Sequence, residues 1–278
     1  MDFNILMKKL IKNIIQKLIA FILILVTFPI QIIIAVIIFI ELKEFPFYFQ
    51  KRAVTLEKDI FTLIKFKTIS NVEAKKISHD NVDDIFYISN EKIKLTKFAK
   101  FLRKTGLDEL PQLYNVFFGQ LNFIGPRPLM IDELQVIKNS FPSFYETRNK
   151  IQSKPGITGL WQVFGDRKKG IENLIGLDTY YENSKSFFLD LKIIGYTIIL
   201  LLTGNNSDAL SPRLHFISNL FSFSLLDIKI IDYNKHKGKI IYSIQIPEHW
   251  WIADDSISDS EKLKEEKPKL RLLKNSHR

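Results

Sequence analysis

An apolar stretch near the N-terminus constrains this chain more than any other feature. No charged residue occurs between Leu18 and Ile40, and a helix of that length can cross the hydrocarbon core of a bilayer. The apolar part is too long for a signal peptide, and no small-residue cleavage site follows it. Pro29 predicts a kink in the middle, because proline removes a helical hydrogen bond and clashes with the preceding turn. The sequence therefore predicts a membrane-associated protein.

Basic residues flank this stretch on both sides and leave two topologies open. Positive residues prefer the cytoplasmic side of a membrane. A single span places one basic flank outside, whereas a bent helix that enters and leaves by the same face keeps both flanks inside. The residue pattern alone favours neither. The basic residues are Lys8, Lys9, Lys12 and Lys17 before the stretch, and Lys43, Lys51 and Arg52 after it.

The composition is typical of a folded protein with anionic partners. The 278 residues are 46% hydrophobic and 25% charged, which excludes wholesale disorder and provides enough chain for a core. The chain has no cysteine, which excludes disulfides, thiolate metal sites and a cysteine nucleophile. Its net charge of +10 favours phosphorylated small molecules, anionic lipid or nucleic acid as partners. Because no nucleic-acid recognition motif is present, we expect no nucleic-acid partner.

The hydrophobic pattern after the apolar stretch predicts an α+β fold that is mostly helical. Residues 45–68 are rich in aromatic and β-branched residues and are expected to be extended. The segment 187–202 fits either an amphipathic helix at a membrane surface or a buried core helix. Further expected elements are helices at 92–102, 107–118 and around 131–150, turns at 124–129 and 154–162, and a C-terminal β-hairpin formed by 227–233 and 239–246.

The candidate chemical centre is the adjacent pair Asp108 and Glu109. Carboxylates are common in the first turn of a helix, where they meet the positive end of its dipole, so the pair alone does not establish a site. Here Arg103 and Lys104 precede the pair by a few residues. Such cations together with a helix start can hold a phosphate. One carboxylate can then bind a divalent metal ion while the other attacks phosphorus.

Two further loops contain residues suited to ligand binding. Arg127 lies between two prolines, and a rigid arginine is suited to bidentate recognition of phosphate. Gly156 and Gly159 allow the backbone to approach a ligand closely. The loop of Arg127, taken alone, is better explained as a simple turn with a solvated arginine, and the glycine loop is also typical of an ordinary turn. The absence of Walker A, G-x-G-x-x-G and G-x-S-x-G strings argues against nucleoside triphosphatases, Rossmann folds and serine hydrolases, and the five scattered histidines form no metal-ligand spacing.

These strings together resemble the bacterial sugar transferase family. Its members are monotopic phosphoglycosyl transferases that start polysaccharide or glycan assembly on undecaprenyl phosphate. The resemblance runs over about residues 10–204, and residues from about 208 onward lie outside it. The matching strings are KFKT (65–68), LTKFAKFLRKTGLDELPQLYNVFFGQLNFIGPRPL (95–129), PGITGLWQVFG (155–165) and LDTYYENSKSFFLDLKIIGYTIILLL (177–202).

The resemblance implies a role for each candidate residue. Family members carry a re-entrant helix broken at a proline, here Pro29. Their aspartate of the Asp-Glu pair is the nucleophile, here Asp108, and the glutamate, here Glu109, helps to bind Mg²⁺. The remaining expected substrate-binding residues are Arg103 and Arg127, on the substrate phosphates, with Lys65, Pro155 and Gly156.

The implied activity is transfer of a phospho-sugar from a UDP-sugar to undecaprenyl phosphate. The products are UMP and undecaprenyl-diphosphate-sugar, and the intermediate is a phospho-sugar held covalently on Asp108. The alternative is a catalytically impaired homologue that binds lipid or a partner. Departures from the family pattern motivate it: residues 53–57 replace a glycine-bearing turn, Gly106 replaces a serine, and residues 120–122 replace Asp-Met-Ser.

The resemblance also implies an architecture and a location. We expect a re-entrant membrane anchor over residues 1–44, a small catalytic domain with surface amphipathic helices over 45–207, and an extension with a β-hairpin and charged tail over 208–278. The expected location is the bacterial cytoplasmic (inner) membrane, with the catalytic domain facing the cytoplasm. The sequence leaves open the identity of the sugar and whether the protein forms a homo-oligomer.

Overall fold

The computed structural model describes residues 3–75, 94–165 and 170–202, together with four two-residue strands farther along the chain. The chain divides into two compact units, Met1–Leu210 and Ser211–Arg278, and each is described by itself. The first unit contains every candidate site residue and is mostly helical with a small amount of sheet, as the sequence predicts.

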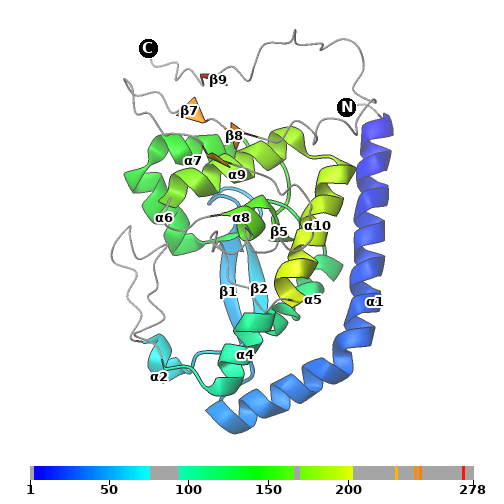
Figure 1. Ribbon diagram of the computed structural model, residues 1–278, viewed down its shortest axis with the longest axis vertical. Helices are drawn as coiled ribbons and strands as arrows, with labels where there is room; N and C mark the ends of the chain where they lie inside the picture. The colour runs from blue at the N-terminus through cyan, green and yellow to red at the C-terminus, as the bar shows by residue number, and fades with distance from the viewer. Residues whose placement is uncertain are drawn as a thin grey trace. The chain divides into compact units, whose positions relative to one another are not determined.

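The N-terminal helix α1 (Phe3–Leu42) is a long helix with a pronounced bend (Figure 1). Pro29 is the proline inside it, and a proline within a helix breaks one backbone hydrogen bond and pushes the preceding turn away. Two polar side chains lie close to Pro29: Thr27 donates to the Leu23 carbonyl at 2.7 Å, and Gln31 donates to the Thr27 hydroxyl at 2.9 Å. Residues Leu10–Leu42 are long and apolar enough to cross a membrane, judged by length and composition.

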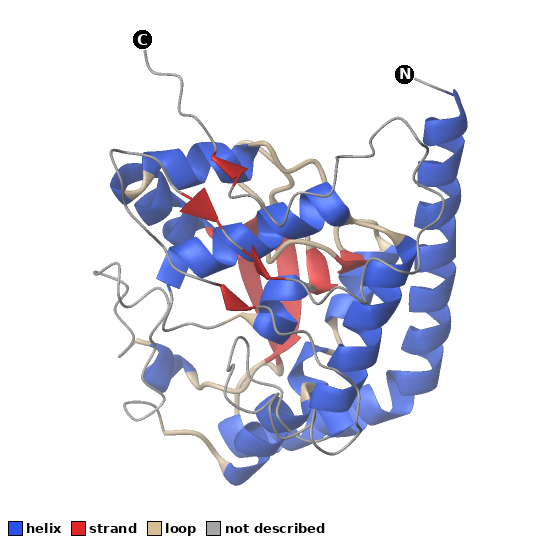
Figure 2. Cartoon of the chain, turned by 45° about the horizontal axis from the view of Figure 1, so that its top comes forward, coloured by secondary structure: helices blue, strands red, loops and turns tan. Residues whose placement is uncertain are grey.

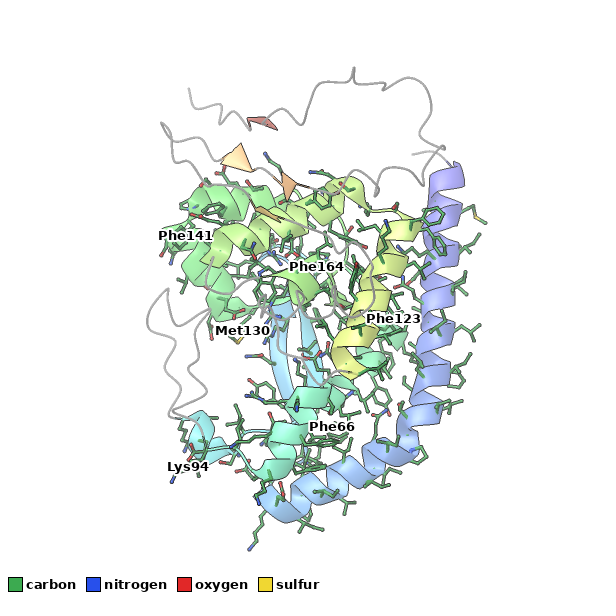
Figure 3. The ribbon with its side chains drawn as sticks, viewed as in Figure 1. Phe66, Lys94, Phe123, Met130, Phe141 and Phe164 are labelled. Carbon is green, nitrogen blue, oxygen red and sulfur yellow. The ribbon has the colours of Figure 1, made fainter. Side chains whose placement is uncertain are left out.

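Both arms of α1 pack against the rest of the first unit. Before the bend, Ala20 is buried in a cluster with Phe61, Leu63, Val116 and Leu121. After the bend, Ile34 and Ile38 are buried against Phe66 and Leu102. Phe66 accordingly lies between α4 and the second arm of α1 (Figure 3).

A three-stranded antiparallel sheet forms the centre of the unit. Strand β1 (Phe47–Ala53) pairs with β2 (Phe61–Phe66), with Phe47 opposite Phe66 and Arg52 opposite Phe61. The short strand β4 (Leu129–Met130) pairs with the other edge of β1. This confirms the prediction that residues 45–68 are largely extended.

A second, two-stranded sheet arises where only turns were expected. Strand β3 (Asn122–Ile124) pairs in parallel with β5 (Gly156–Thr158). Three-residue strands are too short to produce a hydrophobic alternation in the sequence, and their partners lie far apart along the chain. The pairing matters for the site because it joins the two glycine- and proline-rich loops.

Helices cover the strands (Figure 2). The helix expected around 131–150 is interrupted because Pro142 disfavours a helical conformation at Phe141, whose φ and ψ are −137° and 60°. The segment 107–118 likewise begins as a 3-10 turn ahead of Pro111. The sequence pattern did not predict α9. The helices are α2 (Asn71–Ala74), α4 (Lys97–Thr105), 3-10 helix η2 (Leu107–Glu109), α5 (Gln112–Phe117), α6 (Ile131–Ser140), α7 (Pro142–Asn149), α8 (Leu160–Phe164), α9 (Gly170–Ser184) and α10 (Phe187–Leu202).

Helix α10 has one buried face and one exposed apolar face. One face is buried through Leu189, Asp190 and Ile193, while a second apolar set is exposed. A run of exposed large apolar side chains on a helix is typical of a surface that contacts lipid or another protein. The exposed set comprises Phe187, Phe188, Leu191, Ile194, Ile198, Leu201 and Leu202.

The second unit contains four described strands. Strand β6 (Lys229–Ile230) pairs antiparallel with β8 (Ile244–Gln245), and β7 (Ile241–Tyr242) pairs antiparallel with β9 (Arg271–Leu272). The remainder of the predicted hairpin and the charged tail lie outside the described residues, so the hairpin stays a prediction.

Candidate active site

The Asp-Glu pair lies in a tight turn that is set up by Gly106. Helix α4 ends at Thr105, and Gly106 follows with φ of +71°, a left-handed conformation that favours glycine. The Gly106 amide donates to the Leu102 carbonyl and so closes the end of α4. The 3-10 turn η2 begins at the next residue and carries Asp108 and Glu109.

Asp108 is a buried carboxyl group with a strongly raised pKa. Its residue is only 8% exposed. Burial, reinforced by the charge of neighbouring Glu109, raises its pKa from an ordinary value of 3.8 to about 7, while Lys65 and Arg103 act in the opposite direction. A buried carboxylate with a displaced pKa beside cations is typical of a functional group.

Glu109 is held by Lys65, which comes from the central sheet. The Lys65 ammonium donates to the Glu109 carboxylate at 2.6 Å, and both side chains are partly exposed. Lys65 lies on β2 on the same side as Phe61 and Leu63, because side chains alternate along a strand. Those two residues are buried, so the hydrophobic face of β2 directs Lys65 toward η2.

Asn115 fixes the distance between the sheet and the turn. Its side chain is fully buried and binds the edge of β2 as another strand would: its amide donates to the Thr62 carbonyl at 2.7 Å and its oxygen accepts from the Ile64 amide at 3.0 Å. Helix α5 is thereby attached to β2, and η2 lies immediately before α5. Sequence reasoning missed this residue, although a polar residue between Leu113 and Val116 on a hydrophobic helix face is a signal for such a contact.

Arg103 completes this first group. Its Nε donates to the Thr68 hydroxyl at 3.0 Å, and its charge lowers the pKa of Asp108. The structure therefore brings four predicted site residues together from two segments of the chain: Lys65, Arg103, Asp108 and Glu109.

Arg127 belongs to a second group, whose centre is a buried ion pair. Arg148 and Asp178 are 0% and 1% exposed, and the Arg148 Nη1 donates to the Asp178 carboxylate at 2.5 Å. Asp178 also accepts from the Arg127 amide at 3.3 Å, and Arg148 donates to the Arg127 carbonyl and, at 2.8 Å, to the Val54 carbonyl. The backbone of Arg127 is thus anchored by α7 and α9, whereas the Asp-Glu turn is anchored by α4 and β2.

The Arg127 side chain lies over an aromatic ring. Its guanidinium carbon is 4.5 Å from the centre of the Trp161 indole, in α8. Sequence reasoning identified none of the three residues Trp161, Arg148 and Asp178. For Arg148 a signal exists, since it follows Phe144 by four residues and so lies on the buried face of α7.

The glycines of the two loops allow the two backbones to pack directly against each other. A Cβ on Gly156 would lie 2.1 Å from the Gly125 nitrogen, and one on Gly159 would lie 2.1 Å from the Gly125 oxygen. Pro155 and Gly156 are buried. The need for glycine is thus explained by the packing of one loop on the other, and a direct contact of Pro155 or Gly156 with substrate stays a prediction.

Comparison with known proteins places this site in a family. The sequence model of the bacterial sugar transferase family matches residues 7–204, which include both groups of site residues. The chain belongs to the bacterial sugar transferase family. The match begins within α1 and ends just after α10, so the family region coincides with the part of the first unit described above.

Several members of this family are similar to the chain in sequence. It is 34% identical over 179 residues to the uncharacterized sugar transferase EpsL of Bacillus subtilis. This alignment covers 64% of this chain and 80% of that protein. It is 32% identical over 168 residues to the galactosyl transferase CpsE of Streptococcus agalactiae, covering 58% of this chain and 36% of that protein. It is 40% identical over 124 residues to a UDP-glucose:undecaprenyl-phosphate glucose-1-phosphate transferase of Klebsiella pneumoniae, covering 43% and 26%. The chain thus matches most of EpsL but well under half of the other two sugar transferases.

Proposed function

We propose that this sugar transferase is a phosphoglycosyl transferase that moves a sugar phosphate from a UDP-sugar to undecaprenyl phosphate. The observation that carries the proposal is the buried carboxyl of Asp108 beside Glu109, Lys65 and Arg103. A nucleophile surrounded by cations is suited to attack on an anionic diphosphate. A relative from Klebsiella pneumoniae is named for glucose-1-phosphate transfer to undecaprenyl phosphate, which supports the same reaction class here.

The first chemical step takes place at the Asp108 carboxylate. An Asp108 oxygen forms a bond to the β-phosphorus of the UDP-sugar, and the bond from that phosphorus to the bridging oxygen breaks. UMP leaves with the bridging oxygen and its electron pair. The phosphosugar remains on Asp108 as an acyl phosphate. In the second step, an oxygen of undecaprenyl phosphate attacks the same phosphorus and restores the Asp108 carboxylate.

Lys65 and Arg103 serve both steps through their charge. They stabilise the ionised form of Asp108, because each lowers its pKa. They also offer positive charge to the diphosphate of the donor and to the phosphate of the acceptor, both of which would otherwise be repelled by two carboxylates. The acceptor, undecaprenyl phosphate, and the leaving group, UMP, both carry a negatively charged phosphate. One set of cations is therefore sufficient for both.

The donor set at this turn fits Mg²⁺. The described residues contain no group of three or more His, Cys, Asp or Glu side chains that could enclose a metal ion. Mg²⁺ is commonly bound by one or two carboxylates together with substrate phosphates, and Glu109 can provide one such carboxylate. Glu109 is the residue proposed to hold it, after release from Lys65. When bound, Mg²⁺ neutralises negative charge on the diphosphate.

Contacts along α1 support a re-entrant anchor. Lys12 pairs with Asp190 of α10 at 2.9 Å, and the Gln16 side chain accepts from the Phe123 amide at 3.0 Å. After the bend, Ile34 and Ile38 pack on β2 and α4. Both ends of α1 are therefore attached to one folded unit, as expected if α1 enters and leaves the cytoplasmic membrane by one face. The acceptor phosphate would then meet Asp108 at the headgroup level.

The experiment that tests this function measures UMP release. Full-length protein in nanodiscs containing undecaprenyl phosphate is incubated with Mg²⁺ and, separately, with each of a panel of UDP-sugars. We expect UMP release from one donor or a few, and loss of release in Asp108→Asn. If folded protein releases no UMP from any donor, the proposed activity is wrong, and the impaired, lipid-binding homologue becomes the better description.

A further inference from the structure

The backbone of Arg127 is held more firmly than an ordinary turn requires. The Arg148–Asp178 pair contacts it on both sides, because Asp178 accepts from the Arg127 amide and Arg148 donates to the Arg127 carbonyl. Pro126 and Pro128 restrict the neighbouring backbone as well. Burying an ion pair is costly unless its hydrogen bonds are satisfied. Here the pair bonds to both the amide and the carbonyl of Arg127, and Arg148 also donates to the Val54 carbonyl.

The side chain of Arg127 rests on the Trp161 indole. The separation of 4.5 Å between the guanidinium carbon and the ring centre lies well within the range of a cation–π contact. Trp161 is buried, in the short helix α8 that follows Gly159. Gly159 packs against Gly125, so the loop that carries Arg127 and the helix that carries Trp161 are locked together.

The choice of tryptophan is informative because its polar atom is unused. The Trp161 indole nitrogen is buried and has no hydrogen-bond partner in the described part of the chain. An unsatisfied buried N–H is unfavourable, and phenylalanine would fill an apolar site without it. Tryptophan is, however, the best aromatic partner for a cation. The ring face under Arg127 therefore accounts for a tryptophan better than core packing does.

Stacking on the Trp161 indole holds the Arg127 guanidinium in an orientation that is suited to binding phosphate. The N–H groups of arginine lie in the plane of the guanidinium, whereas the contact with Trp161 uses its flat face. A guanidinium held in one plane can present its edge to two phosphate oxygens without first losing side-chain freedom.

We propose that Trp161 is a positioning residue, which together with the Arg148–Asp178 pair holds Arg127 in the orientation that binds the diphosphate of the donor. This inference rests on the proposed function, because that function supplies the diphosphate. It concerns how Arg127 is held, and it predicts that Trp161 acts on donor binding through Arg127 and in no other way.

A double-mutant cycle with UDP as the probe tests this coupling. The Kd of UDP is measured by calorimetry for full-length protein in nanodiscs, in the forms Trp161→Leu, Trp161→Phe, Arg127→Ala and Trp161→Leu/Arg127→Ala. We expect Trp161→Leu to weaken binding by about 3- to 30-fold, the range from an exposed to a desolvated cation–π contact. Trp161→Phe should restore much of the affinity, because it retains an aromatic face. In the Arg127→Ala background, Trp161→Leu should add no further loss.

Phe164→Leu serves as the matched control on the same helix. Phe164 is labelled in Figure 3. It packs edge-on against Tyr196 of α10 at 5.1 Å between ring centres, so its loss perturbs α8 without removing the ring under Arg127. Any effect of Phe164→Leu on Kd should be the same with and without Arg127. Thermal unfolding of each variant establishes that it is folded.

Four results would overturn the proposal. The first is an equal loss from Trp161→Leu in both backgrounds, which would make Trp161 a core residue only. The second is no loss from Trp161→Leu. The third is unchanged UDP affinity in Arg127→Ala, and the fourth is no UDP binding by the wild-type protein. Because UDP binding is measured without turnover, failure of the proposed transferase reaction would appear separately, as UDP binding without UMP release.

Discussion

At the scale of single residues, Asp108 is placed where its charged form is disfavoured. Burial and the neighbouring Glu109 raise its pKa to about 7, and Lys65 and Arg103 offset only part of that rise. In the proposed role of Asp108, the ionised carboxylate would be reactive because it is poorly solvated. Burying such a group lowers the stability of the folded protein, and in the proposed reaction it raises the reactivity of the carboxylate.

Asp108→Asn should lower turnover and, at the same time, raise the thermal stability of the protein. We expect turnover to fall by about 10³-fold or more, because the amide oxygen that replaces the carboxylate is a far weaker nucleophile. In the folded protein the pKa of Asp108 lies above its ordinary value. Ionised Asp108 therefore destabilises the wild-type protein increasingly as pH rises from about 4 to about 7. The variant should therefore unfold ~2–8 °C higher than wild type at pH 8, equivalent to about 1–2 kcal/mol for a domain of this size, and the difference should vanish near pH 4. Thermal unfolding in nanodiscs measures it, with the exposed Asp132→Asn as the control; a lower melting temperature at pH 8 would contradict this placement of Asp108.

The pH dependence of kcat/KM reports the same group. We expect kcat/KM to rise through an apparent pKa near 7, because attack requires the carboxylate. Lys65→Met removes a cation that lowers the pKa of Asp108. The rising limb of the pH profile should therefore move to higher pH, and kcat/KM should also fall. Lys100→Met, at an exposed position on α4, should leave the limb in place. A limb that stays fixed in Lys65→Met would show that Lys65 does not act on Asp108.

At the scale of elements, the proposed re-entrant anchor depends on how α1 is attached to the folded unit. Lys12 and Gln16 attach its first arm to the folded unit, while Ile34 and Ile38 attach its second. Thr27 and Gln31 occupy the bend with side-chain hydrogen bonds. Such bonds to the helix backbone and between turns favour bending next to a proline.

Single cysteines test the topology of α1, since the chain has none of its own. Phe3→Cys and Lys100→Cys are labelled in intact cells with a membrane-impermeant reagent. We expect both to be protected until the cells are lysed. Labelling of the residue-3 cysteine alone would mean that α1 spans the membrane. In Pro29→Ala, which restores the helical hydrogen bond, a larger fraction of residue-3 cysteine should become accessible.

The elements also show which parts of the fold can be predicted from sequence. The extended segment of β1 and β2 and the helices α4 and α10 follow from local patterns such as FTLIKF and the spacing of Phe98, Phe101 and Leu102. The parallel pair β3–β5 does not, because it depends on two loops meeting through Gly125 and Gly156. The break between α6 and α7 could have been predicted from Pro142, whose effect on Phe141 is local.

The same distinction applies to the site. Asp108 and Glu109 are adjacent in sequence, and the cations close to them in the chain are enough to indicate a phosphate ligand. Asp178 lies 30 residues from Arg148 in sequence, and a buried pair at that separation leaves no periodic trace. Asn115, which bonds the edge of β2, likewise depends on a tertiary contact. The residues of the candidate site could therefore be chosen from the local sequence, whereas the residues that hold them in place could not.

At the scale of the whole molecule, the proposed chemistry is confined to the first unit. The family match ends at residue 204, and the first compact unit ends at Leu210. We expect deletion of residues 211–278 to change the rate of UMP release by less than about 3-fold, because every proposed catalytic and binding group precedes it. Size-exclusion chromatography and thermal unfolding establish that the truncated protein is folded. A folded but inactive truncation would place a substrate contact in the C-terminal unit.

The most direct test of the central claim is isotope exchange without the lipid acceptor. Protein freed of undecaprenyl phosphate is placed in nanodiscs of defined lipid with Mg²⁺, the accepted UDP-sugar and labelled UMP. If Asp108 forms a phosphosugar intermediate reversibly, label enters the UDP-sugar with no acceptor present, and Asp108→Asn abolishes this exchange. Exchange that appears only after undecaprenyl phosphate is added would show direct transfer between the two substrates and contradict the covalent role of Asp108.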